Sequence, residues 1–304
     1  REREMIPLEG VVDWDADMNE FETLRPLLFG IAYRMLGSAM EAEDVLQEAY
    51  LRWSAVDPSQ VRSARAYLTK LVTHLCLDQL KSARERREQY PGEWLPEPLL
   101  TASAADEPLA RTLEIESLSI AFLLLLEHLT PVERAVFLLR EVFDYSHKEI
   151  ADSIGKSEAA ARQLLHRAKQ RIEGGRRVDV HDLAEHQQVF GAFLQAVSEG
   201  DLPGLMSLIS SDAVALSDGG GKASAALYPL KGSAVIAKFY IGLRNRAPED
   251  TTFEVAVLNG KPALLVYANG TLETAIMLNV EGGRIQNVYS MRNPDKLHLR
   301  AMPV

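Results

Sequence analysis

The spacing of apolar residues changes once along this 304-residue chain, and the change constrains the fold more than any other feature. Through residues 18–173 apolar side chains recur every three or four positions, which predicts amphipathic helices. From residue 250 onwards short apolar runs are separated by Asn259-Gly260 and Asn269-Gly270, and Asn-Gly is the strongest short signal for a hairpin. The sequence therefore predicts all-α domains followed by an α+β domain with a curved antiparallel sheet.

Clear start and stop signals bound the later helices of the first part. Thr130–Glu133 and Ser146–Glu149 each fit a capping box, and Gly155 fits a helix stop. These signals predict three helices between residues 131 and 173. The short turn that contains Gly155 is what a helix-turn-helix requires between its two helices.

A proline-rich segment divides the helical region of residues 18–173 into two parts. Pro91-Gly92 stops the preceding helix, and the prolines of Trp94–Pro98 favour an extended backbone. Trp94 and Leu95 are unusual in a linker, and they either pin it onto a neighbouring core or make a regulatory contact. The expected boundaries are 18–90 and 110–177 for the helical domains, 91–109 for the linker and 180–304 for the α+β domain.

Charge is distributed unevenly. The chain has a net charge of −10, which argues against non-specific binding to nucleic acid. Residues 62–90, however, carry seven basic and three acidic side chains, and residues 156–177 carry seven and two. Two basic islands in an acidic chain are typical of a protein that touches phosphates at two separate places. An exposed basic helix can also be merely solvated, so both interpretations stay open.

Several classes of protein fit poorly. The single cysteine, Cys76, excludes an internal disulfide framework and a cysteine-based zinc site, and we expect no metal or cofactor. No apolar run is long enough for a membrane helix, and the first thirty residues show no secretory signal, so we expect a cytoplasmic protein without a membrane partner. Asp212, Asp218 and Glu254 are possible acids of an enzyme, but they form no recognisable constellation, and no catalytic residue is expected.

Two segments carry a resemblance to a known family. Glu41–Trp53 resembles region 2 of the bacterial extracytoplasmic-function sigma factors, and Leu129–Arg171 resembles their region 4 helix-turn-helix. The resemblance covers about residues 18–175, and the two basic islands coincide with the two helices that read DNA in that family. Residues 180–304 resemble a SnoaL-like domain, which has the cone-shaped NTF2-like α+β architecture. A subgroup of these sigma factors carries such a domain fused after region 4.

The resemblance implies the partners and their binding residues. It implies binding to core RNA polymerase, at the β′ clamp helices and the β flap, and to promoter DNA at the −10 and −35 elements. The candidates for polymerase binding are Asp44, Gln47, Glu48, Leu51 and Arg52, whose acids could otherwise be a solvated helix face. The candidates for −10 DNA, where stacking and phosphate contacts open the strands, are Arg65, Tyr67, Lys70, His74, Lys81, Arg84 and Arg87. The candidates for −35 DNA, in the helix-turn-helix at 147–171, are Ser157, Ala160, Arg162, Gln163, His166, Arg167, Lys169 and Arg171.

The Gly-rich loop at Asp218–Lys222 has three interpretations. It is not a phosphate-binding P-loop, because Lys222 is followed by Ala223 rather than Ser or Thr. It can line a pocket for a small-molecule ligand, contact the linker, or be only a turn. If it contacts the linker, the C-terminal domain modulates the sigma factor in cis. The candidates for these regulatory contacts are Trp94, Leu95, Pro96, Asp218, Gly219, Gly220, Gly221, Lys222, Asn293, Pro294, Asp295 and Lys296.

Two other functions stay as alternatives at this point. A one-component helix-turn-helix regulator with a ligand-binding domain would bind duplex DNA without polymerase, but it leaves residues 18–88 unexplained. A SnoaL-like enzyme would need an acid or base inside the cone.

The sequence departs from the family at one candidate for −10 DNA. Many members have asparagine where this chain has His74, so the lining of the pocket for an unstacked −10 base is not predicted. His74 can equally be a histidine whose hydrogen bonds are satisfied within its helix.

Overall fold

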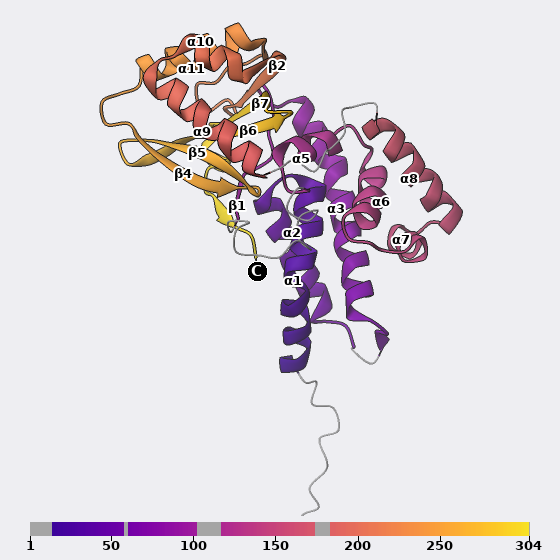
Figure 1. The fold of residues 1–304 in the computed structure, drawn as a ribbon. Helices are drawn as coiled ribbons and strands as arrows, with labels where there is room; N and C mark the ends of the chain where they lie inside the picture. The colour runs from indigo at the N-terminus through magenta and orange to yellow at the C-terminus, as the bar shows by residue number, and fades with distance from the viewer. Residues whose placement is uncertain (1–13, 58–59, 102–116, 174–182, 304) are drawn as a thin grey trace, which may run out of the picture.

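The computed structural model describes residues 14–57, 60–101, 117–173 and 183–303, and it contains three domains packed against one another (Figure 1). The first helical domain has an apolar centre because each of its helices buries one face. In α2 the buried face includes Val45, Leu46 and Trp53, at helical spacing. Its helices are α1 (Trp14–Leu36), α2 (Ala39–Trp53) and α3 (Ala64–Glu88).

The second helical domain follows the predicted punctuation. Thr130 and Ser146 both form complete capping boxes, and Gly155 ends α7 with a left-handed φ of 65° that costs glycine little. The turn at Gly155 joins α7 to α8 as a helix-turn-helix. The helices are α5 (Ile120–Leu126), α6 (Pro131–Glu141), α7 (His147–Ile154) and α8 (Glu158–Glu173).

The C-terminal domain is the expected α+β cone. Strands β4 to β7 form the predicted antiparallel ladder, and β2 extends it by pairing with β7 in parallel. The helices are α9 (Leu183–Glu199), α10 (Leu202–Leu208) and α11 (Ser233–Asn245). The main strands are β2 (Ile209–Asp218), β4 (Thr252–Leu258), β5 (Lys261–Ala268), β6 (Thr271–Glu281) and β7 (Arg284–Met291), with the short β3 (Leu230–Lys231) beside β2.

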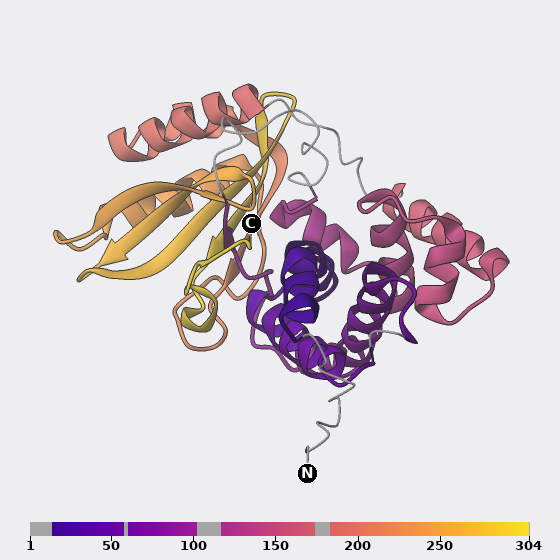
Figure 2. The ribbon, with the colours of Figure 1, turned by 90° about the horizontal axis from the view of Figure 1, so that it is seen from below.

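Both faces of this sheet are covered, by different partners. Because side chains alternate along a strand, Leu264 on β5 packs with the domain's own helices, whereas Ala263 and Leu265 join the core of the two helical domains. Figure 2 shows α9 lying along one face of the sheet. The other face meets α5, which lines a narrow crevice with Leu258 and Met277. The C-terminal domain therefore shares a hydrophobic core with the helical domains.

The linker itself becomes part of the sheet. Its strand β1 (Leu99–Leu100) pairs with β4, and the tail strand β8 (Arg300–Ala301) pairs with β1 in parallel. The backbone N–H of Asn259 donates to the Leu99 carbonyl at 2.9 Å. The periodicity of the sequence did not predict these two short strands. No helix in the described part of the chain has the length and apolar character needed to cross a bilayer.

Candidate functional site

The outward face of α2 carries the predicted polymerase-binding residues. Asp44, Gln47 and Glu48 are all exposed, and Arg52 pairs with Glu48 at 2.7 Å. Leu51 is 63% exposed on the same face. The first turn adds Met40, 50% exposed, which the sequence did not single out. The face thus combines acidic groups with large apolar side chains that nothing in the described chain covers.

The predicted −10 residues divide into an open row and a pair that contacts other domains. Lys70, His74 and Lys81 are exposed along one side of α3, and the half-buried Tyr67 packs its ring against Trp53. Two other candidates, Arg65 and Arg87, instead contact other domains. The side chain of Arg84 lies outside the described residues.

The predicted −35 residues lie on the outward side of α8. Gln163 and His166 are exposed, while Ser157 caps the helix by accepting from the Ala160 N–H at 3.2 Å. The basic residues pair with acids of the same domain, because the acids lie on the same helix or on the adjacent α6. These pairs are Arg162 with Glu158 at 2.5 Å, Arg167 with Glu133 at 3.9 Å, Lys169 with Glu141 at 2.9 Å and Arg171 with Glu133 at 2.5 Å.

The two helical domains are joined at the carboxyl end of α1. Arg87 donates to the Leu36 carbonyl at 2.7 Å, and Arg134 donates to the Met35 carbonyl at 2.6 Å. Glu127 pairs with both arginines. Burial alone raises the pKa of Glu127, but Arg134 and Arg87 outweigh it and hold that pKa below its usual value. The carboxylate therefore stays charged and bridges the two domains.

A second contact between these domains involves α3 directly. The hydroxyl of Tyr145, just before α7, lies 2.8 Å from the Thr69 hydroxyl and accepts from Arg65 at 3.3 Å. The Arg65 guanidinium also lies over the Tyr145 ring, 5.3 Å from its centre. Arg65 therefore contacts the second helical domain through its guanidinium, although the residue is exposed at the surface.

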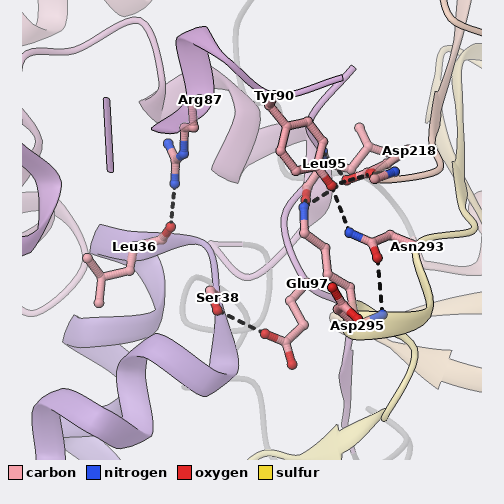
Figure 3. Close-up of polar contacts among 11 residues, drawn as sticks. Leu36, Ser38, Arg87, Tyr90, Leu95, Glu97, Asp218, Asn293 and Asp295 are labelled. Atoms are coloured by element: carbon pink, nitrogen blue, oxygen red, sulfur yellow. Dashed lines mark hydrogen bonds and ion pairs between the residues drawn. The ribbon is translucent and has the colours of Figure 1, made fainter. Parts of the chain in front are cut away.

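The Gly-rich loop meets the linker around Asp218, which is completely buried (Figure 3). Its carboxylate accepts from the Tyr90 hydroxyl at 2.7 Å and from the Leu95 N–H at 2.9 Å. It also pairs with Lys296 of the tail at 2.7 Å. Asn293 completes the set by donating to the Tyr90 hydroxyl at 2.8 Å. We call Tyr90, Trp94, Leu95, Asp218, Asn293 and Lys296 the junction cluster.

The glycines of the loop allow this close approach. A β-carbon on Gly221 would lie 2.7 Å from the ring of Pro91, and one on Gly220 would overlap Asn293. Both glycines have positive φ, which other residues rarely adopt. Lys222 and Asp295 form an exposed ion pair at 2.5 Å beside them. Gly219 and Pro96 are buried, with Gly219 packed against Ala223 and Ala225 of its own loop. Pro294 begins the 3-10 turn η4 (Pro294–Lys296) that carries Lys296.

The linker is bound to the first helical domain as well. Glu97, 3% exposed, accepts from the Ser38 hydroxyl at 3.0 Å and from the Ala39 N–H at 2.8 Å. A carboxylate at the N-terminus of a helix is stabilised by the unpaired N–H groups and the helix dipole. Glu97 thereby holds the beginning of α2, the helix with the acidic and apolar face.

One residue that sequence reasoning missed contacts all the other parts. Asn259, 2% exposed, donates from its amide to the Tyr33 hydroxyl at 2.7 Å and to the Leu118 carbonyl at 2.8 Å. Its amide oxygen accepts from the Leu99 N–H at 3.0 Å. The sequence marked Asn259 only as a turn residue, and no local signal distinguishes it from Asn269. Asn259 connects the first helical domain, the linker, the second helical domain and the sheet.

Some predicted features are not described or lie apart. The expected linker includes residues 102–109, which are outside the described residues. Among the described residues no group of histidine, cysteine, aspartate or glutamate could hold a metal ion. The crevice at α5 is lined by Asn259, Asn279 and Tyr289 among others, and the Gly-rich loop is not part of its lining.

Comparisons with known proteins identify the two helical domains and relatives of the whole chain. Models of sigma-70 region 2 and of sigma-70 region 4 match residues 21–86 and 119–172. The chain is 36% identical to the ECF RNA polymerase sigma factor SigJ of Mycobacterium tuberculosis, over 92% of this chain and 93% of the relative. It is 31% identical to the probable ECF RNA polymerase sigma factor SigI of the same species, over 90% of this chain and 92% of that one.

A solved structure extends the agreement to all three domains. The crystal structure of M. tuberculosis SigJ matches with a TM-score of 0.74 at 33% identity, covering 92% of this chain and 97% of that one. The family expected from the sequence is thus confirmed by two domain models in the expected order and by relatives matched over nearly their whole length. The chain belongs to the extracytoplasmic-function sigma factors of the sigma-70 family.

Proposed function

We propose that this sigma factor directs core RNA polymerase to promoters through three exposed helix faces, and that its C-terminal domain modulates this activity in cis. The face of α2 binds the β′ clamp helices of the polymerase. The open row of α3 contacts the −10 element, and the outward side of α8 reads the −35 element. The C-terminal domain limits this activity by holding the two helical domains, and with them the three faces, in the arrangement described above. We call this the closed arrangement.

The observation that carries the polymerase contact is the composition of the α2 face. Met40 and Leu51 are 50% and 63% exposed and lie before and after the acidic residues of α2. A helix face that only contacts water is not expected to carry both of these large apolar side chains. Exposed apolar side chains next to charged groups are typical of a surface that docks against another protein. Glu97 supports the proposal, because it fixes the first turn of α2 through the Ser38 hydroxyl and the Ala39 N–H.

The test of this contact is Leu51→Ala, with Leu243→Ala as the matched control. Leu243 is also a partly exposed leucine on a helix, 43% exposed, but it lies on α11 of the C-terminal domain. We expect Leu51→Ala to reduce co-elution with core polymerase and run-off transcription about tenfold, in the range of an interface hot spot. Equal behaviour of the two variants would overturn the assignment of α2 as the polymerase-binding face.

The two DNA contacts are supported by exposure and chemistry. Lys70 and Lys81 are exposed, and Lys81 pairs with Asp78 on its own helix. Both lie on the same side of α3 as His74 and Tyr67, so they can follow a phosphate backbone while the Tyr67 ring stacks. On α8, Gln163 is exposed and has the amide geometry that recognises an adenine edge. Duplex and single-stranded promoter probes separate the two contacts.

The cis restraint is supported by Asn259 and by the shared core. Removing the whole C-terminal domain would expose the apolar surface of the helical domains that packs against its sheet. Such a truncated chain would tend to aggregate, so its activity would not report on regulation alone. A point variant avoids this problem. Asn259→Ala removes the hydrogen bonds that the side-chain amide makes with Tyr33, Leu99 and Leu118, and it leaves the sheet in place.

Asn269→Ala is the matched control for Asn259→Ala. Both asparagines precede a glycine in a hairpin turn and have almost the same positive φ, 52° and 50°, but Asn269 is exposed. Alanine therefore strains both turns equally, and only Asn259→Ala loses bonds between domains. We expect Asn259→Ala to raise the affinity of the free chain for promoter DNA about tenfold. Unchanged or lower affinity relative to Asn269→Ala would contradict the restraint.

A further inference from the structure

The ammonium group of Lys296 lies in a site that fits a cation closely. Its Nζ lies 2.7 Å from Asp218 Oδ2 and 2.7 Å from the Leu95 carbonyl oxygen. Two aromatic rings complete the surroundings, with the ring centre of Trp94 at 4.4 Å and that of Tyr90 at 5.0 Å. A carboxylate, a carbonyl and two ring faces are the groups that recognise a primary ammonium ion.

The walls of this site are held together without Lys296. Asp218 is fixed by bonds from the Tyr90 hydroxyl, the Leu95 N–H and the Gly220 N–H, at 2.7, 2.9 and 3.0 Å. All of these come from the linker region or the Gly-rich loop, so they remain when the lysine side chain is withdrawn. Figure 3 shows Tyr90 and Leu95 converging on Asp218 in this way.

The Trp94 ring is fixed independently too. The guanidinium of Arg87 lies over it, 3.8 Å from the ring centre, and the ring packs so tightly on Gly37 that a β-carbon there would approach it to 2.7 Å. Gly37 and Arg87 belong to the first helical domain. The cation site is therefore preorganised by contacts that do not involve its occupant, and preorganisation lowers the entropic cost of binding.

The occupant lies on a short turn whose flanking residues are anchored, because Leu297 packs into the shared core and the tail strand β8 pairs with β1. Lys296 ends the three-residue turn η4 and keeps 13% of its side chain exposed, so the lysine side chain alone has to leave the site. The side chain of the neighbouring Asp295 pairs with the exposed Lys222, and an exposed pair contributes little stability. The turn is also held by Asn293, which donates to the Tyr90 hydroxyl.

We propose that Tyr90, Trp94, Asp218 and the Leu95 carbonyl form a binding site for a primary alkylammonium group, which the resting chain fills with its own Lys296. We call these four groups the ammonium cage. Tethering raises the effective concentration of Lys296 above its own dissociation constant, so the cage is filled at rest and an external amine competes with the lysine by mass action. The ligand is a free alkylamine or a lysine side chain of another protein, since both present the same group.

Occupation of the cage by an external amine replaces the bonds of Lys296 to Asp218 and the Leu95 carbonyl, which join the tail to the loop and the linker. An effect of this exchange on transcription rests on the cis restraint proposed above, whereas the binding of the amine does not. A test that measures binding to the free chain therefore separates the two: loss of binding overturns the cage and leaves the sigma factor function untouched.

The test uses Lys296→Ala, which empties the cage, with Lys296→Met as the matched control that fills the space without a charge. The probe is n-butylammonium, and the readout is fluorine NMR of chain labelled with 5-fluorotryptophan. The Trp94 signal is identified by its loss in Trp94→Phe. We expect the Trp94 signal of Lys296→Ala to shift saturably, with a Kd of about 1–10 mM, as for a small ligand in a preformed site.

Four comparisons sharpen the result. Lys296→Met should show no saturable shift, and the wild-type chain should need about tenfold more amine because its own lysine competes. Asp218→Asn combined with Lys296→Ala should bind at least tenfold more weakly, because the amide cannot pair with the cation. Tetramethylammonium should also bind more weakly than n-butylammonium, because it has no N–H to donate to Asp218 and Leu95.

A final arm distinguishes the two sources of the ligand. N-acetyl-lysine methylamide presents a lysine side chain with its backbone, and binding at least as tight as that of n-butylammonium assigns a protein partner. Tighter binding of the free amine assigns a small molecule. The proposal is overturned if Lys296→Ala keeps its thermal unfolding transition and shows no saturable shift. If Lys296→Ala does not fold, the absence of a shift in the wild-type chain at high amine concentration overturns it instead.

Discussion

The two basic islands of this sigma factor are treated differently by the fold. On α8 the cations pair with acids of their own domain, as Arg171 does with Glu133 at 2.5 Å. On α3 the terminal arginines reach into other domains: Arg65 contacts Tyr145, and Arg87 contacts Glu127 and Trp94. The ion pairs on the outward side of α8 therefore lie within one domain. On α3, part of the basic surface makes contacts with other domains instead.

This difference shows where regulation can act. Separating the helical domains breaks the contacts of Arg65 with Tyr145 and of Arg87 with Glu127 but leaves the pairs of α8 intact. A variant that breaks a contact between domains should thus change both stability and binding to −10 DNA. A variant that changes only a side chain on the outward side of α8 should change only contacts to −35 DNA.

The largest effect is expected for Glu127→Gln. The change leaves the buried Arg134, whose side chain is 4% exposed, without its carboxylate partner. Breaking one side of a buried ion pair costs about 3 kcal/mol, so the free energy of unfolding in urea should fall by that amount. Asp144→Asn is the control, because Asp144 is 93% exposed in its pair with Arg140 and should change stability by less than about 0.5 kcal/mol.

The same contact predicts a dependence on pH. The pKa of Glu127 is lower in the folded chain than in the unfolded chain. Its stabilising contribution is therefore complete above the ordinary glutamate pKa of about 4.3 and is lost as the pH falls through the lower folded value. Unfolding free energies between pH 6 and pH 3 should fall more steeply for wild type than for Glu127→Gln, and parallel curves would refute the assignment.

An intermediate effect is expected for Tyr145→Phe. The change removes the hydroxyl that meets Thr69 and Arg65 but keeps the ring under the guanidinium. The free energy of unfolding should fall by about 1 kcal/mol, as for a typical buried hydrogen bond. Binding of the free chain to single-stranded −10 DNA should rise about threefold in fluorescence anisotropy, whereas binding to a −35 duplex should not change.

The smallest effect on stability is expected for Arg162→Ala. Arg162 is exposed, and its ion pair is with Glu158 on its own helix, so stability should change by less than about 0.5 kcal/mol. The loss should instead appear in binding to a −35 duplex. If Arg162 contacts a phosphate, the slope of log K against log salt concentration falls by about one. An unchanged slope would remove Arg162 from the DNA interface.

Much of the fold was predictable because its signals are local. The capping boxes at Thr130 and Ser146 and the stop at Gly155 place α6, α7 and α8 almost to the residue. The two Asn-Gly turns place the hairpins of β4, β5 and β6. Each signal acts within a few residues, so the sequence alone contains it.

The contacts between domains were less predictable because their partners are distant in sequence. The strands β1 and β8 have two residues each, too few for a periodic pattern, and they form only because the edge of β4 is available. Glu97 caps a helix that begins nearly sixty residues earlier, at Ala39. Asn259 and Asn269 have the same local pattern, and only the packing of the domains makes one of them a connecting residue.

The most direct test of the closed arrangement is a distance measurement between α3 and α8. The only cysteine, Cys76, is buried, so spin labels can be attached selectively through Ser82→Cys and Gln170→Cys on exposed positions. Our account predicts one narrow distance distribution in the free chain, which moves to longer distances in Asn259→Ala and on adding core polymerase with promoter DNA. A broad distribution in the free chain that none of these changes affects would contradict it.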